Sequence, residues 1–401
     1  MVADRQAVVT GLGVLSPLGR GPDATWQAVT SGRSGIVRRP DDGRLVALVP
    51  GDVLRIECRD GQGRPLLGRA AGLAIAAVED AMASAGLGAA DEDTSPDLVV
   101  GTTMGEPTWI DTWPDADAAQ DPTPPHRAAE LLLGAPDGLA AAVADGVGLA
   151  GRVAAVGGAC AAGNYALARA LDDVRSGRSD VVVAGGVDAF SRTALMGFAK
   201  LGALAEDGCR PFGQDRQGLV LGEGAAFLVV EERSHAVARG AEPIGVLAGA
   251  GLSCDAHHPT SPDPSGAGAA KALAAALSDA EVESGDVGWV SAHGTGTPAN
   301  DRAEVLALSQ VFAGYDRPPA SSVKSLTGHG LGAASAIEAV VGLVALRHGL
   351  MVPTWHVGDQ DPECDWDVLV DGPRELDRGV VVNQAYAFGG CNAVTVLRRA
   401  S

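Results

Sequence analysis

The chain has 401 residues, 46% of them hydrophobic, which is enough to bury a large core as two domains or as one duplicated domain. Its formal net charge of -20 and its aromatic content of only 4% argue against nucleic-acid binding through a basic surface or a stacking platform. The six cysteines are scattered without a Cys-x-x-Cys pair, and the first ten residues lack a secretory apolar region. No apolar run has the length of a membrane span, so we expect a reduced, cytoplasmic protein that binds no membrane.

Strand-like and helix-like segments alternate along the chain. In the first half the pattern predicts a strand running into a glycine turn at 7–14, a helix at 68–86, a strand at 97–101, a surface loop at 113–125, a strand at 152–156, a helix at 164–176, and strands at 180–184 and 225–230. In the second half it predicts a strand at 244–251, a helix at 267–278, a strand at 287–291, a helix at 333–348, and strands at 379–383 and 394–397. This alternation predicts parallel sheets covered by helices on both faces. Both halves open on a strand with glycines, which by itself does not establish a duplication.

Cys160 lies among small residues (157–163), between a predicted buried strand and a predicted helix. A thiol at a helix N-terminus is close to free backbone N–H groups and to the positive end of the dipole, and both favour the thiolate. The neighbouring glycines and alanines allow a tight turn that presents the sulfur and provides an oxyanion hole. An inert buried cysteine is the alternative, and on this segment alone the two interpretations stay open.

His293 follows the predicted strand at 287–291, and the glycines and threonines at 294–297 predict a loop. Ligand sites of parallel α/β proteins gather at such strand ends. Nearby acidic residues favour a proton-handling or hydrogen-bonding role for this imidazole. A satisfied structural histidine is the alternative.

His329 lies on a glycine-rich turn just before the predicted helix at 333–348. The helix N-terminus would favour a neutral imidazole, which can donate one hydrogen bond. Lys324 precedes His329, and Glu338 falls within the helix where it could pair with Lys324. Taken alone, this segment also fits a helix cap beside an ordinary ion pair.

Two further patterns could indicate ligand binding but fit structural roles better. His257 and His258 could bind a metal, but no third and fourth ligand has suitable spacing, so we predict a loop and no metal site. Gly11 and Gly13 lack the third glycine and the downstream acid of a dinucleotide fingerprint, so we predict a packing turn there.

Taken in order, these segments resemble the β-ketoacyl-acyl-carrier-protein synthase family, the condensing enzymes of fatty acid and polyketide synthesis. The resemblance extends almost from end to end of the chain. It rests on the segments 8–19, 157–163, 210–226, 293–301, 324–329 and 387–393.

The resemblance implies an α/β protein with the thiolase fold, in which two similar halves form a five-layered αβαβα sandwich. We place the halves at 1–242, with the nucleophilic cysteine, and at 243–401, with the catalytic histidines. It also implies a homodimer, or a heterodimer with a chain-length-factor-like partner. Substrates would arrive on the phosphopantetheine arm of an acyl carrier protein, with no bound cofactor and no metal.

Residue by residue, the resemblance assigns Cys160 as the nucleophile that takes the acyl chain. It assigns His293 and His329 as the pair that promotes malonyl decarboxylation and stabilises the enolate. The supporting residues that it implies are the Lys324–Glu338 ion pair, Phe388 and Gly389 for gating and the oxyanion hole, and Asp301, Glu304, Thr295 and Thr297 for the His293 loop.

The chain departs from the family pattern in places. Gly213 and Gln217 stand where aspartates are usual, and Ala162 stands where serine is common. The region 102–150, which in the family shapes the acyl pocket and the dimer interface, is the least similar, so acyl length and partner stay open. Docking positions for the acidic carrier protein are predicted at Arg64, Arg69 and Arg127.

The sequence thus predicts a synthase that condenses a Cys160-bound acyl group with malonyl-carrier protein, in fatty acid or, preferentially, type II polyketide synthesis. The alternative is an acyltransferase on the same scaffold that forms an ester or amide without decarboxylation. Two retained histidines disfavour that alternative, since such an enzyme has less use for a second imidazole. A non-catalytic scaffold subunit is the third hypothesis, and the complete Cys-His-His set argues against it.

Overall fold

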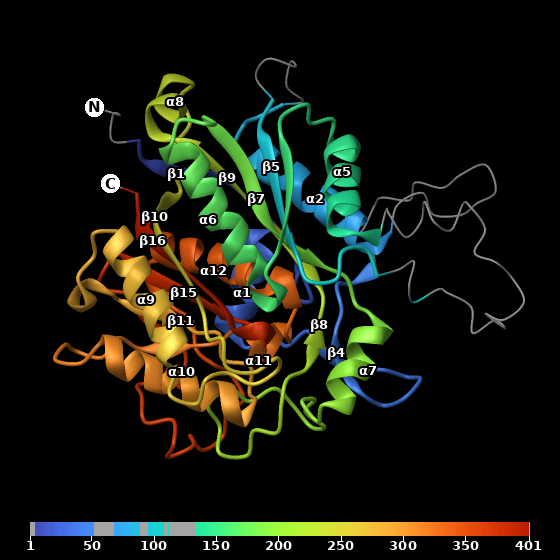
Figure 1. Cartoon of the computed structure of the whole chain (residues 1–401), viewed down its shortest axis with the longest axis vertical. Coiled ribbons are helices and arrows are strands. Elements are labelled where there is room, and N and C mark those ends of the chain that lie inside the picture. Colours follow the sequence, from blue (N-terminus) through green and yellow to red (C-terminus); the bar gives the residue numbers. More distant parts are fainter. Residues whose placement is uncertain (1–4, 52–67, 89–94, 108–110, 112–133, 401) are drawn as a thin grey trace, which may run out of the picture.

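The computed structural model describes residues 5–51, 68–88, 95–107, 111 and 134–400, and one large mixed sheet dominates it (Figure 1). The strands of this sheet are β1 (Ala7–Ser16), β2 (Gly19–Arg20), β5 (Asp97–Thr102), β6 (Val153–Gly157), β7 (Val181–Asp188), β9 (Gly224–Glu232), β10 (Gly245–Cys254), β11 (Trp289–Ser291), β12 (Ala320–Ser321), β15 (Val380–Tyr386) and β16 (Cys391–Arg399). Their order is β12-β11-β15-β16-β10-β1-β9-β7-β5-β6, with β2 beside β1. Two small sheets contain β3 (Ile36–Arg38), β4 (Leu45–Ala47) and β8 (Leu221–Gly222), and β13 (Leu350–Met351) and β14 (Arg374–Glu375).

The order of the large sheet is symmetric about its centre, where β1 and β10 lie side by side. On each side the inner pairs are antiparallel and the outer pairs are parallel. A bulge recurs at corresponding points, between Val9 and Gly11 on β1 and between Leu247 and Gly249 on β10. The two halves of the chain therefore share one topology, and the predicted parallel pairing holds only for the outer strands. The boundary at 242/243 falls just before β10 and stays a prediction.

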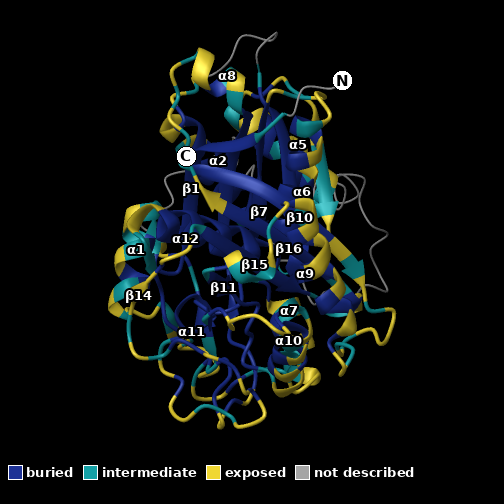
Figure 2. Ribbon diagram, turned by 90° about the vertical axis from the view of Figure 1, so that its left-hand side faces the viewer, coloured by how far each residue is buried: buried dark blue, intermediate teal, exposed yellow. Residues whose placement is uncertain are grey.

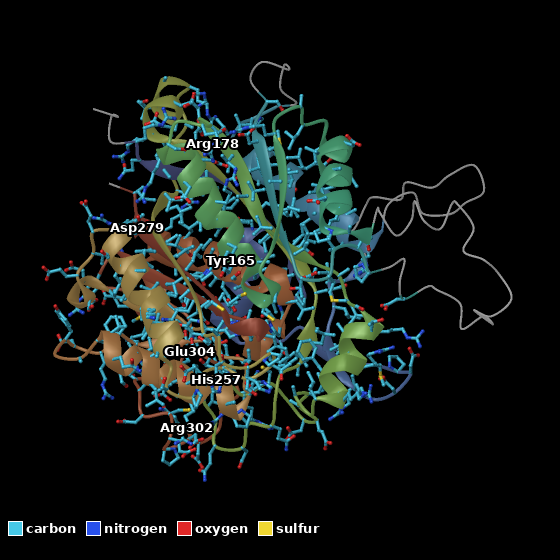
Figure 3. All side chains as sticks on the ribbon, viewed as in Figure 1. Tyr165, Arg178, His257, Asp279, Arg302 and Glu304 are labelled. Carbon is cyan, nitrogen blue, oxygen red and sulfur yellow. The ribbon has the colours of Figure 1, made fainter. Side chains whose placement is uncertain are left out.

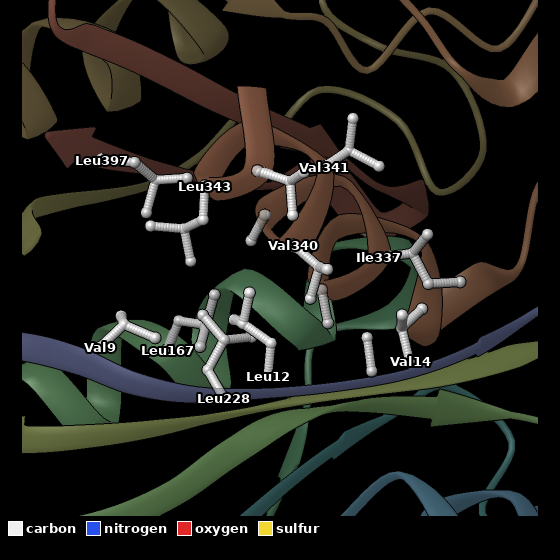
Figure 4. Packing of buried hydrophobic residues seen from close by; sticks show 14 of the residues in the cluster. Val9, Leu12, Val14, Leu167, Leu228, Ile337, Val340, Val341, Leu343 and Leu397 are labelled. Carbon is white, nitrogen blue, oxygen red and sulfur yellow. The ribbon is translucent and has the colours of Figure 1, made fainter. Parts of the chain in front are cut away.

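Helices form three layers around this sheet. On the outer faces lie α2 (Arg69–Ser84) and α5 (Pro136–Val147) against the N-terminal half, and α9 (Ala267–Asp279) and α10 (Pro298–Val311) against the C-terminal half. Between the halves lie α6 (Ala162–Arg175) and α12 (Ala334–His348). Figure 4 shows this central layer, with Leu167 and Leu343 packed between Leu228 of β9 and Leu397 of β16. Figure 2 shows the sheet and central helices buried, in the five-layered arrangement that the sequence predicts.

The remaining helices are α1 (Pro22–Ser31), α7 (Arg192–Lys200), α8 (Arg233–Ala238) and α11 (Lys324–Thr327). The sequence pattern missed α1, α5, α7, α8, α10 and α11. Three of these six begin with proline at the first or second helical position, a start signal that hydrophobic periodicity does not register. The predicted loop at 113–125 lies outside the described residues.

The stretch Leu331–His348, which includes α12, is long and apolar enough to cross a membrane by length and composition alone. This corrects the expectation that no segment passes such a test. However, 89% of the stretch is buried inside the fold, because α12 is enclosed between the two halves of the sheet. An all-round apolar helix of this kind is typical of the core of a large globular protein.

Gly11 and Gly13 lie within β1 and not in the predicted turn. A Cβ atom on Gly13 would be 1.9 Å from the carbonyl oxygen of Ala77, so α2 rests directly on the strand. The second half repeats the contact, because a Cβ on Gly251 of β10 would be 2.1 Å from the carbonyl oxygen of Ala272 in α9. These glycines therefore permit the close approach of helix and sheet.

We expect Gly13→Ala to lower the free energy of unfolding by about 2 kcal/mol or more, because the new methyl group meets backbone atoms that cannot move independently. Gly197→Ala is the matched control. It lies inside α7 with open space around the added Cβ, and should be neutral or stabilising by up to about 1 kcal/mol. Thermal and urea unfolding measure both changes. Equal effects of the two substitutions would contradict the proposed close contact.

Candidate active site

Cys160 occupies the predicted junction of strand and helix. It lies in a single 3-10 turn, Ala159–Ala161, between β6 and the N-terminus of α6. Ala159 has a φ of 46°, in the left-handed region, so the chain turns sharply just before the cysteine. The side chain of Cys160 is 6% exposed and faces an apolar cluster that includes Leu219 and Leu331.

The electrostatics of Cys160 differ from the prediction that the helix N-terminus favours a thiolate. Burial raises the pKa of Cys160 to about 12, and the Asp188 carboxylate adds to the rise. Lys324 and the backbone N–H groups of Cys160 and Phe388 lower this pKa, but by less than burial raises it. The resting residue is therefore a thiol whose anion would be stabilised by two N–H donors.

His293 lies in the loop between β11 and α10, and α10 itself holds this loop. Glu304 of α10 accepts hydrogen bonds from the backbone N–H groups of His293 (2.7 Å) and Gly294 (2.8 Å). Asp301, one turn earlier, accepts from the N–H of Gly296 at 3.2 Å. Both carboxylates therefore support the His293 loop, in the way that the resemblance implied for Asp301 and Glu304. Burial raises the pKa of Glu304 to about 7.

Glycine is required in this loop. Gly294 has a φ of 34°, and a Cβ there would be 2.6 Å from Ser322. The hydroxyl of Thr295 lies 2.9 Å from that of Thr297, which precedes α10. The backbone geometry of Gly294 and the contact between the two threonines therefore fix the conformation of this loop.

His329 forms an isolated parallel β-bridge with Leu221, and its backbone N–H donates to the Val220 carbonyl at 2.7 Å. A 3-10 turn (Leu331–Ala333) then leads into α12. The ring of His329 meets that of His293 edge-on, with centroids 5.4 Å apart. Burial, followed by Lys324, lowers the pKa of His329 well below its ordinary value, so the imidazole is neutral as predicted, although burial rather than the helix is the main cause.

Burial also lowers the pKa of His293 well below its ordinary value, with smaller contributions from Lys324 and His329. Lys324 is fully buried and forms the predicted ion pair with Glu338 of α12. Its ammonium also donates to the His293 carbonyl oxygen at 2.6 Å. The cation therefore ties the His293 loop to α12 and helps keep both imidazoles neutral.

These groups converge on one cavity of about 310 Å³. Cys160, His293, His329 and Phe388 line it, together with Thr295 and Thr297. Phe388 and Gly389 lie in a turn between β15 and β16, and the Phe388 ring packs against Phe198 with centroids 5.6 Å apart. Residues from both halves of the chain thus surround the cysteine.

Sequence reasoning missed several buried polar residues around the site. Asp188, at the end of β7, accepts hydrogen bonds from the N–H groups of Thr103, Met104 and Gly332, so it joins β5 to the start of α12. Tyr386 packs edge-on against His293, and its hydroxyl has no hydrogen-bond partner among the described residues. No local sequence signal distinguishes these side chains, because their partners are distant along the chain.

The other predicted site residues are placed as follows. Arg64 and Arg127 lie outside the described residues. Arg69 forms an ion pair with the buried Glu223 and donates to the Val49 carbonyl, so its guanidinium is engaged within the protein, and its docking role stays a prediction. His257 and His258 are exposed in a loop, as predicted, and no metal-binding group of His, Cys, Asp and Glu occurs within the described ranges.

The departures from the family pattern also have structural settings. Gly213 has no room for a side chain, since a Cβ would be 2.7 Å from the Val357 carbonyl oxygen. Gln217 is exposed and lines the cavity, and Ala162 is fully buried at the start of α6. The cavity wall therefore carries an uncharged amide at position 217.

Comparison with known proteins gives consistent results over the whole chain. Residues 62–236 match the family description "Beta-ketoacyl synthase, N-terminal domain" and residues 244–358 match "Beta-ketoacyl synthase, C-terminal domain". "Nodulation protein E" of Rhizobium leguminosarum bv. trifolii is 39% identical, covering 99% of this chain and 100% of that protein. "3-oxoacyl-[acyl-carrier-protein] synthase 2" of Staphylococcus aureus (strain N315) is 33% identical, covering 100% and 99%.

Among solved structures, "The ishigamide ketosynthase/chain length factor" is 36% identical to this chain and superimposes with a TM-score of 0.90. The match covers 100% of both chains, so the five-layered arrangement is the thiolase fold. Members of this family are acyltransferases that need no cofactor beyond the phosphopantetheine of the carrier-bound substrate. The chain belongs to the β-ketoacyl synthase family.

Proposed function

We propose that the chain is a β-ketoacyl-acyl-carrier-protein synthase that performs decarboxylative Claisen condensation. The observation that supports this most directly is that one cysteine and two neutral imidazoles line the same cavity. A neutral imidazole can donate a hydrogen bond to a developing oxyanion without carrying a charge that would bind the malonyl carboxylate too firmly.

The first half-reaction is transfer of the acyl group to Cys160. The sulfur attacks the thioester carbonyl of the acyl-carrier protein, and the tetrahedral oxyanion is held by the N–H groups of Cys160 and Phe388. Collapse of this intermediate expels the carrier thiolate, which takes the proton that Cys160 loses. Because the resting thiol is protonated, transfer depends on these donors stabilising the charged state as it forms.

The second half-reaction uses His293 and His329. As malonyl-carrier protein loses carbon dioxide, negative charge develops on the thioester oxygen, where the two imidazole N–H groups donate hydrogen bonds. The resulting carbanion attacks the acyl group on Cys160, and the cysteine leaves as a thiolate. Lys324 contributes indirectly, since it holds the His293 loop and keeps both rings neutral.

The relatives support proposals for the partners and the pathway. One relative is a synthase that acts with acyl carrier protein, and another is described as a ketosynthase/chain length factor. We propose a cytoplasmic enzyme of fatty acid or, preferentially, type II polyketide synthesis. The edge strand β6, which pairs only with β5 within the described ranges, offers backbone groups for pairing with a second thiolase-fold subunit, identical or homologous.

An acyltransferase that forms an ester or amide without decarboxylation is the alternative. It would need Cys160 and one base, whereas here two histidines face the same cavity. The two proposals differ in one measurable step, the release of carbon dioxide from malonyl-carrier protein.

We expect Cys160→Ala to abolish acylation, because no other thiol lines the cavity within the described ranges. Incubation with acyl-carrier protein, followed by intact-mass measurement, should show one added acyl group on the wild-type chain and none on the variant. Cys209→Ala, at a buried thiol that does not line the cavity, is the control and should still be acylated. Acylation of the Cys160 variant to the wild-type extent would refute the mechanism.

His329→Ala should retain acylation within about threefold but lose about 100-fold or more in malonyl decarboxylation, the typical cost of an oxyanion donor. Release of labelled carbon dioxide measures the second step, and mass spectrometry measures the first. His257→Ala, in the exposed loop, is the matched control and should change neither. An unchanged decarboxylation rate in His329→Ala would remove its assigned role and favour the alternative function.

The pH dependence of thiol reactivity tests the resting state of Cys160. With a pKa of about 12, the thiolate fraction grows through the accessible range, so alkylation by iodoacetamide should increase about tenfold per pH unit between pH 7 and 9. For an ordinary thiol the alkylation rate levels off at about pH 9. The rate is followed on the Cys160 peptide by mass spectrometry. A plateau below pH 8 would show that the helix N-terminus, and not burial, dominates.

A further inference from the structure

Two cysteines without an assigned role lie opposite each other on neighbouring strands, next to Asp255 and Asn392, which line the cavity. Cys254 ends β10 and Cys391 begins β16, and the register of these antiparallel strands pairs the two residues directly. Neither takes part in the proposed chemistry. Cys254 is exposed and Cys391 is partly exposed, so both thiols can be reached from solvent.

The hydrogen-bond pattern places this pair at a favourable position for a covalent link. The N–H of Asp255 donates to the Gly390 carbonyl at 2.9 Å, so the neighbouring pair is the hydrogen-bonded one and Cys254–Cys391 is a non-hydrogen-bonded pair. Residues at such a position have Cα atoms about 4.5 Å apart and close side chains. Disulfides occur at Cα separations from about 4.4 Å.

The side chains also share one environment. Burial first, and then the nearby Cys391 and Cys254, raise the pKa of Tyr165 of α6 (labelled in Figure 3) to about 12. Both sulfurs are therefore close to the same phenol. No third protein ligand accompanies them among the described residues, which argues for thiol chemistry and not for a metal site.

We propose that Cys254 and Cys391 form a redox-modification site that low-molecular-weight disulfides such as oxidised glutathione convert to an intrachain disulfide. The Cys254 thiolate attacks one glutathione sulfur and releases the other as a thiolate. The Cys391 thiolate then attacks the sulfur of Cys254 and releases the second glutathione. The protein loses two electrons and two protons, and one oxidised glutathione becomes two reduced molecules.

The disulfide would act on the segment that carries the oxyanion donor. In the reduced protein the Cys254 thiol donates to the Gly389 carbonyl at 3.7 Å, and Gly389 follows Phe388 directly. Oxidation removes this donor and links the end of β10 to the start of β16 beside the turn. Resting on the proposed function, we infer that the oxidised form transfers acyl groups to Cys160 more slowly, because the link constrains the turn that carries the Phe388 N–H donor.

The full-length protein is treated with millimolar oxidised glutathione, free thiols are blocked with N-ethylmaleimide, and the digest is analysed by mass spectrometry. The work is done on wild type and on Cys160→Ala, so that the nucleophile cannot confuse the pairing. We expect a linked Cys254–Cys391 peptide that dithiothreitol separates. Glutathione attached to Cys254 alone, or no linked peptide, would overturn the proposal.

Cys254→Ser and Cys391→Ser each remove one partner, and Cys364→Ser, at a buried cysteine, is the control that should keep the link. Acylation of Cys160 is then compared before and after oxidation, with an expected slowing of at least threefold in wild type and none in either serine variant of the pair. Linkage without slowing would overturn the coupling to Phe388. The linked peptide is detected without any activity measurement. Failure of the proposed function would appear separately, as no acylation of the reduced protein, and so can be told apart from failure of the disulfide proposal.

Discussion

The close approach of α6 and α12 at their N-terminal ends is the constraint on which the site depends. A Cβ on Gly163 would be 2.7 Å from the Ser335 hydroxyl and 2.9 Å from a backbone nitrogen of α12, so only glycine permits this contact. Next to it, Asn164 and Asn383 exchange buried hydrogen bonds that fasten the helices to β15. Since Cys160 and His329 lie just before these two helices, the same contact fixes Cys160 beside His329.

Burial at this junction sets the charge state of every reactive group. It raises the pKa of Cys160 and lowers the pKa of both imidazoles, so a neutral thiol faces two neutral rings. Lys324, the buried cation beside the two histidines, is balanced by Glu338 and does not line the cavity. Preorganised N–H donors, and not formal charges, are therefore the means by which the site can stabilise developing oxyanions.

The turn that carries Phe388 connects this interior to the protein surface. The backbone N–H of Phe388 acts on the Cys160 sulfur, and the Phe388 ring packs against Phe198. The residues that follow Phe388 are hydrogen-bonded to the chain just after β10 and to Pro259. One short segment thus combines an electrostatic and a steric role. A covalent link beside it at Cys254–Cys391 would act on both roles at once, without altering any group that contacts substrate.

The sequence by itself determined the alternation of elements and, through resemblance, the family and the five layers. It also predicted Cys160, His293 and His329, which meet in one cavity, because glycine-rich turns around such side chains are local signals. It also indicated the Lys324–Glu338 pair. Only the tertiary structure decided that α2 packs directly against Gly11 and Gly13 and that Arg69 forms an ion pair with Glu223. It also decided that burial has a larger effect on the pKa of Cys160 than the helix N-terminus. Each of these depends on contacts between residues far apart in the chain. Desolvation and close packing come from such contacts and leave no mark in a local pattern.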